Sequence, residues 1–249
     1  MNTNISKSLS QIHLSGDTIK LIAVISMIID HSGYCLLRYY MNLHYMDILP
    51  QTYTRLNNVY EVMRGIGRLA FPIFCFFLVE GFLRTRNIKK HILRLLVFTI
   101  VSEVPFDLAH FRVPLEWSHQ NVMFELLLGF LMLILIQYIE NIIGLSNNVK
   151  WLCIICSVAA FSEIACYCKA DYNIKGIILI AVLYLLKSSG ALSLIAGAAT
   201  ISVEKYAPIS FILLYFYDAE RRPKLKYFFY LFYPIHLFVI YLLGFLLFQ

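Results

Sequence analysis

An acid and a histidine stand side by side in the apolar stretch "KLIAVISMIIDHSGY", which covers residues 20–34. Lys20 precedes His31 by eleven positions. An α-helix turns about 100° and rises about 1.5 Å per residue, so both side chains would leave the same helix face about 16 Å apart. A lysine can bind a phosphate, and a neutral imidazole can take a proton from an attacking nucleophile. This spacing suits a coenzyme held by its phosphates near Lys20, with an extended pantetheine arm that brings a thioester to His31.

Three carboxylates could assist this histidine. Asp30 is adjacent in sequence but points about 100° away on a helix, so it is a poor direct partner for orienting His31. Glu103 and Asp107 are four residues apart in "SEVPFDLA" and would share a face of another helix, with Pro105 between them. One of these two is expected to hold the second ring nitrogen of His31.

Ionisable side chains inside apolar runs cost a few kcal/mol to insert into a bilayer, so each is a functional candidate. The same residues also have structural interpretations. Lys20 could anchor the start of its helix at the lipid headgroups, and His31 could be an interfacial histidine with satisfied hydrogen bonds. Other such residues could join helices by polar contacts or face solvent at a helix end; they are Glu80, Glu125, Glu163 and His236.

The composition is that of a membrane protein. Hydrophobic residues make up 60% of the 249 residues and charged residues 14%, and the mean hydropathy is +0.71. Soluble domains have apolar and charged shares of about one half and one quarter. We therefore predict an all-α, polytopic helical bundle whose main partner is the lipid bilayer of the cell membrane.

The spans are predicted from apolar runs bounded by charges, prolines or glycines. About nine transmembrane helices are expected, with a range of roughly eight to ten, because two of the runs are shorter than the roughly 20 residues of a full crossing and could form one re-entrant pair. We expect a polar tail over residues 1–17, with no cleaved signal peptide, and a single transmembrane domain over residues 18–249. The runs cover 18–38, 66–83, 92–110, 121–140, 151–168, 174–187, 190–203, 207–217 and 227–247.

Basic residues predict the orientation. They gather in one connection near residues 84–94 and in another at Arg221, Arg222, Lys224 and Lys226. The positive-inside rule places both connections, the N-terminus and Lys20 on the cytoplasmic side. The connections at 39–65 and 111–120 would then lie outside. The net charge of +6 is split among short loops, so no nucleic-acid partner is expected.

The six cysteines do not predict a metal or redox site. Most of them lie within apolar runs, where cysteine usually packs as a small hydrophobic side chain. No zinc-binding spacing, glycine-rich phosphate loop or nucleophile elbow is present.

Six motifs in order resemble the TraX family of integral-membrane acetylases, which is named for the F-pilin N-acetylase. The resemblance extends from about Lys20 to Gly244. The motifs are "IIDHSGY", "GIGRLAFPIFCFFLVEGFLRTRN", "RLLVFTIVSEVPFDLA", "NVMFELLLG", "ADYNIKGI" and "KYFFYLFYPIHLFVIYLLG".

The spacing from Lys20 to His31 and the final "YPIH" are also similar to the wider transmembrane acyltransferase superfamily. In that group an Arg or Lys precedes the catalytic histidine by ten intervening residues. The resemblance implies that His31 is catalytic and that acetyl-CoA is the donor, entering from the cytoplasm. The acceptor would be an amine or a hydroxyl, such as a pilin-like peptide N-terminus or a cell-surface glycan.

The predicted function is therefore acetyl transfer, either directly or through an acyl-imidazole. His31 would be the base, assisted by Asp30 and by Glu103 or Asp107. Four cations are candidates for the coenzyme phosphates: Lys20, Arg68, Arg84 and Arg86. Arg68 could instead serve the acceptor side or pair with a carboxylate. The alternative is a proton-coupled transporter or flippase with titrating carboxylates at Glu80, Asp107 and Glu125, although no internal repeat supports it.

Overall fold

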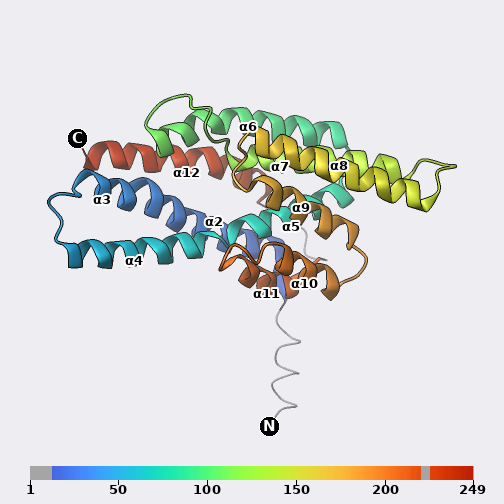
Figure 1. Ribbon diagram of the computed structural model, residues 1–249, viewed down its shortest axis with the longest axis horizontal. Helices are drawn as coiled ribbons and strands as arrows, with labels where there is room; N and C mark the ends of the chain where they lie inside the picture. Colours follow the sequence, from blue (N-terminus) through green and yellow to red (C-terminus); the bar gives the residue numbers. More distant parts are fainter. Residues whose placement is uncertain (1–12, 220–224, 249) are drawn as a thin grey trace, which may run out of the picture.

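A computed structural model describes residues 13–219 and 225–248 and shows an elongated bundle of helices (Figure 1). The chain enters the bundle through α2, Gly16–Ser32. The side chain of Ser15 caps this helix by accepting a hydrogen bond from the backbone N–H of Thr18 at 3.1 Å. A π-helical segment, Gly33–Arg38, and α3, Tyr39–Leu43, continue α2 without a break. Lys20 and His31 both lie in the regular α-helical part, so the geometry expected from their spacing applies.

The second long rod runs back along the first. It consists of α4, Pro50–Gly67, and α5, Ala70–Arg84, and both helices pack against α2. The expected connection over 39–65 was therefore wrong, since most of it is helical. The helix α4 begins at Pro50, a residue suited to the first helical position. Its polar sequence contains no apolar run, which is why a search for apolar runs missed it.

The remaining long helices complete the bundle. The helix α6, Ile88–Phe111, packs against α12, Lys226–Leu247, and against α7, Val122–Glu140. After α7, the chain returns through α8, Asn147–Tyr167, and α9, Asn173–Leu185. The centre of the core is filled by fully buried side chains of α7 and α9, among them Phe130, Leu133 and Leu179.

Two of the apolar runs form a compact hairpin. The helix α10, Ala191–Thr200, packs against α11, Ser210–Tyr215, which follows a single 3-10 turn, Ala207–Ile209. The two short helices lie next to each other below α9 in Figure 1. A two-residue strand, β2, Tyr217–Asp218, then pairs in parallel with β1, Leu14–Ser15. This pairing joins the end of the hairpin to the start of α2.

Five helical segments in the described part of the chain are long and apolar enough to cross a membrane: Gly16–Leu43, Pro50–Arg84, Val122–Glu140, Asn147–Tyr167 and Tyr227–Leu247. This is fewer than the nine expected. The helix α6 is long enough, with 24 residues, but it carries Arg94, Glu103 and Asp107. The helices α9, α10 and α11 are short. The chain is a helical protein with several membrane-spanning segments.

Two parts of the sequence-based topology fall outside the described residues. They are the polar tail up to residue 12 and the basic residues Arg221, Arg222 and Lys224. The basic residues on either side of the connection after α5 are described: Arg84 ends α5, and Lys89 and Lys90 lie in the first turn of α6.

Candidate functional site

A cavity of about 340 Å³ runs between α2, α5, α6, α7 and α12. Both Lys20 and His31 line it. Because these two residues lie eleven positions apart on one helix, the cavity follows α2 for about 16 Å. Between its two polar ends the wall is apolar and aromatic, with Phe74, Phe77 and Leu78 of α5 among the lining residues. The cavity can hold a long, thin molecule with a polar group at each end.

The His31 end contains a pair of histidines from the first and last helices. The Nδ1 atom of His31 lies 2.7 Å from Nε2 of His236, and the two rings are stacked with centroids 4.9 Å apart. The Nδ1 atom of His236 lies 2.9 Å from the carbonyl oxygen of Phe232. His110 of α6 presents its ring to His31 edge-on at 5.6 Å. His31 is therefore held by another histidine.

Asp30 points away from His31, as its position on the helix predicts. Its carboxylate forms an ion pair with the guanidinium of Arg64 at 2.8 Å. Arg64 in turn lies over the ring of Tyr34, 5.2 Å from its centroid. The Asp30 side chain packs directly against the backbone of Gly67, where a Cβ atom would overlap it. Asp30 lines the cavity, but its partner is a cation of α4.

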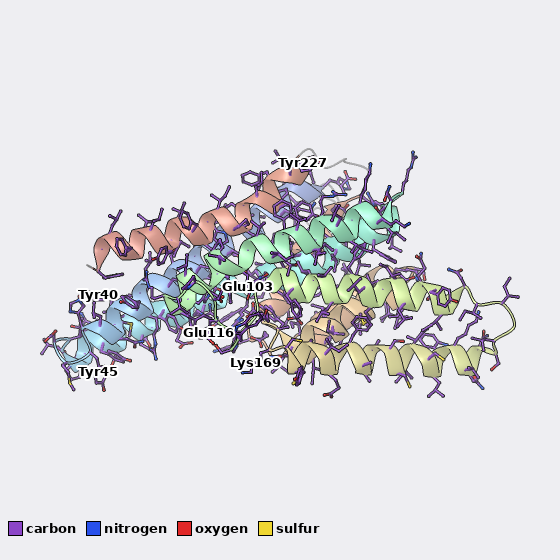
Figure 2. All side chains as sticks on the ribbon, turned by 90° about the horizontal axis from the view of Figure 1, so that it is seen from above. Tyr40, Tyr45, Glu103, Glu116, Lys169 and Tyr227 are labelled. Carbon is purple, nitrogen blue, oxygen red and sulfur yellow. The ribbon has the colours of Figure 1, made fainter. Side chains whose placement is uncertain are left out.

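Glu103 and Asp107 do not orient His31. The side-chain amide of Asn121 donates to Glu103, and the backbone N–H of Glu116 donates to Asp107 at 2.8 Å. Neither carboxylate belongs to the cavity lining. Figure 2 shows Glu103 and Glu116 in the middle of the molecule, where the connection after α6 folds back. The two acids share a face, as expected, but that face meets this connection instead of α2.

The four predicted coenzyme ligands separate into two groups. Lys20 and Arg84 line the cavity. The ammonium of Lys20 lies over the rings of Phe77 and Phe229, at 4.4 and 5.4 Å, and Arg84 is paired with Glu80 at 2.7 Å.

Arg68 and Arg86 lie outside the cavity lining. Arg86 is exposed. Arg68 sits between α4 and α5, where it pairs with Glu204 at 3.4 Å and donates to the hydroxyl of Tyr172 at 3.3 Å. Gly67, the residue before Arg68, packs against Asp30, the residue before His31, so Arg68 belongs to the end away from Lys20.

The sequence interpretation missed an acidic side chain at this same end. Asp171, in the connection between α8 and α9, lines the cavity and is exposed to it. It forms no hydrogen bond or ion pair within the described residues. Tyr172, the next residue, is held by two contacts. Its backbone N–H donates to Glu125 at 2.6 Å, and its ring stacks on Phe71 with the centroids 3.6 Å apart. The motif "ADYNIKGI" marked this segment but gave Asp171 no role.

The model of the family described as TraX protein matches residues 15–244. The chain belongs to the TraX family. A curated relative in Dichelobacter nodosus, a probable fimbrial assembly protein FimC of serogroup H1, is 31% identical over 91% of this chain and 94% of its own length. No solved structure matches the chain. The TraX match includes every helix that lines the cavity, with only the last residues of α12 beyond it.

Proposed function

We propose that this TraX-family chain is a membrane acetyltransferase that moves an acetyl group from acetyl-CoA to an acceptor amine or hydroxyl. The observation that supports it best is the cavity that Lys20 and His31 share. Lys20 and Arg84 bind the coenzyme phosphates at one end, and the pantetheine arm follows the apolar wall. The thioester then lies beside His31.

The transfer needs one base and returns its proton to the leaving group. The acceptor nitrogen or oxygen attacks the acetyl carbonyl carbon and loses a proton to the neutral imidazole of His31. The carbon–sulfur bond breaks as the new carbon–nitrogen or carbon–oxygen bond forms. The thiolate takes the proton from His31, so the products are the acetylated acceptor and free CoA. In a two-step alternative, the acetyl group is first transferred to His31 as an acyl-imidazole and then to the acceptor.

The orientation of the cavity supports a cytosolic donor. Its Lys20 end adjoins Arg84 and Thr85, at the start of the short connection that leads to Lys89 and Lys90 in the first turn of α6. Connections flanked by basic residues lie on the cytoplasmic side of membranes. We place the protein in the cell membrane with α2, α4–α5, α6, α7, α8 and α12 as full-length spans. The short helix α9 brings the chain back from the outer side after α8. The α10–α11 hairpin then enters from the cytoplasmic side and returns to it.

The His31 end of the cavity receives the acceptor. Asp171 offers it an unpaired carboxylate that can accept hydrogen bonds from an amine. The relative named as a probable fimbrial assembly protein supports an acceptor among surface-appendage proteins.

Transport is less well supported. Asp107 and Glu125 accept hydrogen bonds from the backbone N–H groups of Glu116 and Tyr172. Neither carboxylate lines the cavity, whereas Glu80 does. A proton pathway through all three carboxylates has no continuous route along this cavity.

The full-length chain in lipid nanodiscs tests the proposal directly. With acetyl-CoA and tetraglycine as a probe amine, we expect free thiol and acetyl-tetraglycine in equal amounts. Amino-terminally blocked tetraglycine is the control and should give neither, and N-acetylglucosamine is the probe for a hydroxyl acceptor. CoA alone should raise the unfolding temperature. If CoA neither stabilised the protein against heat nor was released from acetyl-CoA, the acetyltransferase proposal would be wrong and transport would be favoured.

Replacing Lys20 with alanine is expected to raise the KM for acetyl-CoA about 10- to 100-fold. This range corresponds to the loss of one charge-assisted hydrogen bond of about 1.5–3 kcal/mol. The kcat should change little, because Lys20 lies far from His31. The matched control is Arg86→Ala, which removes an exposed cation outside the cavity lining. Equal KM values for the two variants would argue against a phosphate site at Lys20.

Replacing Asp171 with asparagine is expected to raise the KM for tetraglycine about tenfold, because a neutral amide holds an amine less tightly than a carboxylate does. The KM for acetyl-CoA should stay the same, since the coenzyme enters at the other end. Glu163→Gln, which changes an exposed acid on α8, is the control. A larger effect on acetyl-CoA than on tetraglycine would contradict the assignment.

A further inference from the structure

The hydrogen bonds around His236 determine where its protons lie. Its Nδ1 atom is 2.9 Å from the backbone carbonyl oxygen of Phe232, one turn earlier in α12. A carbonyl oxygen can only accept. The proton of this hydrogen bond therefore belongs to Nδ1 of His236. His110 makes the same contact with Phe106 at 3.0 Å, so both histidines are fixed by the carbonyl four residues before them.

The surroundings of His236 favour the neutral ring. The side chain is buried, with 7% of its surface exposed, and it stacks on Phe232 with centroids 4.5 Å apart. Within the described residues no carboxylate lies within ion-pair distance of His31, His110 or His236. A buried charge without a counter-ion is costly. A neutral imidazole carries one N–H, so Nε2 of His236 has a lone pair.

This lone pair decides the state of His31. The Nε2 atom of His236 lies 2.7 Å from Nδ1 of His31, and two lone pairs cannot form a hydrogen bond. His31 must therefore donate from Nδ1. Its own lone pair is then on Nε2, the nitrogen that remains available to the cavity that His31 lines.

We propose that His236 is a positioning residue that selects the Nδ1–H tautomer of His31, so that Nε2 of His31 is the base in acetyl transfer. The inference rests on the proposed function for its consequence in turnover, but the tautomer itself does not depend on any activity. The series Phe232 carbonyl, His236, His31 fixes both the ring orientation and the position of the lone pair. His31 thereby receives from His236 the support that a carboxylate gives to the catalytic histidine in many hydrolases.

Nitrogen-15 NMR of the full-length, histidine-labelled chain in lipid bilayers reads the tautomer without any substrate. The His31 signals are assigned from their loss in His31→Asn. We expect the neutral Nδ1–H form in the wild type and a mixture of tautomers in His236→Phe, which keeps a ring against Phe232 but offers no acceptor. His110→Phe should leave the His31 tautomer unchanged. A wild-type His31 protonated at Nε2 would overturn the proposal, whether or not acetyl transfer is observed.

Turnover of acetyl-CoA with tetraglycine gives the second measurement. His236→Phe should lower kcat by about 10²- to 10⁴-fold, the range that a positioned base contributes, with the KM for acetyl-CoA unchanged. His236→Gln places an amide oxygen near the lost Nε2 and should recover kcat to within about tenfold of the wild type. Equal kcat losses in the two variants, or a fully active His236→Phe, would contradict the selection of a tautomer. If His236→Phe does not fold, the wild-type spectrum and His236→Gln still decide the question.

Discussion

Replacing His31 with alanine is expected to lower kcat for transfer from acetyl-CoA to tetraglycine by about 10²- to 10⁴-fold, which is the contribution of a positioned general base. The neutral imidazole lies in the same cavity as Lys20, and no carboxylate on α6 is placed to replace it. CoA should still stabilise the variant against heat, because the proposed phosphate site at Lys20 lies about 16 Å away along α2. Free thiol and acetylated peptide are measured together in nanodiscs.

A control variant distinguishes the loss of the proposed base from the loss of a histidine elsewhere in the protein. His44 lies just after α3 and is paired with Asp47 at 3.7 Å, with 41% of its side chain exposed. His44→Ala is expected to transfer acetyl groups at the wild-type rate. If His31→Ala also turned over at that rate while remaining folded, the chemistry would not pass through this imidazole.

The relation between Lys20 and His31 could be predicted because it is a property of one helix. Both residues lie within α2, before the π-helical segment begins at Gly33. The period of the α-helix therefore fixes their common face and their separation. The same rule gave the divergent direction of Asp30 and the common face of Glu103 and Asp107. What could be predicted was geometry within a helix.

Contacts between helices could not be predicted in this way. The partner of His31 comes from α12, 205 residues later, and nothing in the period of either helix states which faces meet. Glu103 and Asp107 were reasonable partners by chemistry. The structure turns their face toward the connection after α6, where Asn121 and Glu116 bind them.

Arg64 was missed for a different reason. Residues 39–65 contain no continuous apolar run and are rich in Tyr and Asn, so they were assigned to a loop. A cation in a loop has no fixed place. The structure forms α4 there and sets Arg64 against Asp30. The helix is stabilised by packing on α2, because tertiary contacts routinely outweigh the local signal for a polar helix. Asp171 was missed similarly, since the loop before α9 is placed by the hydrogen bond from Tyr172 to Glu125.

Removing the guanidinium of Arg64 is expected to destabilise the protein strongly, because it is the counter-ion of a largely buried carboxylate. The Arg64 and Asp30 side chains are 22% and 14% exposed, and their ion pair measures 2.8 Å. Arg64→Met would leave the Asp30 carboxylate partly buried without its counter-ion. Breaking such a pair from one side costs about 3–5 kcal/mol. We expect a correspondingly lower unfolding temperature in nanodiscs or in mild detergent.

Two further variants decide whether the uncompensated charge is the cause. The double variant Asp30→Asn with Arg64→Met removes both charges and should recover most of the lost stability, because replacing both partners avoids the buried charge. Arg84→Met breaks a more exposed pair, with 49% of the Arg84 side chain accessible, and should cost less than about 1 kcal/mol. If the double variant were no more stable than Arg64→Met alone, the contribution of Arg64 would come from its packing over Tyr34 and not from its charge.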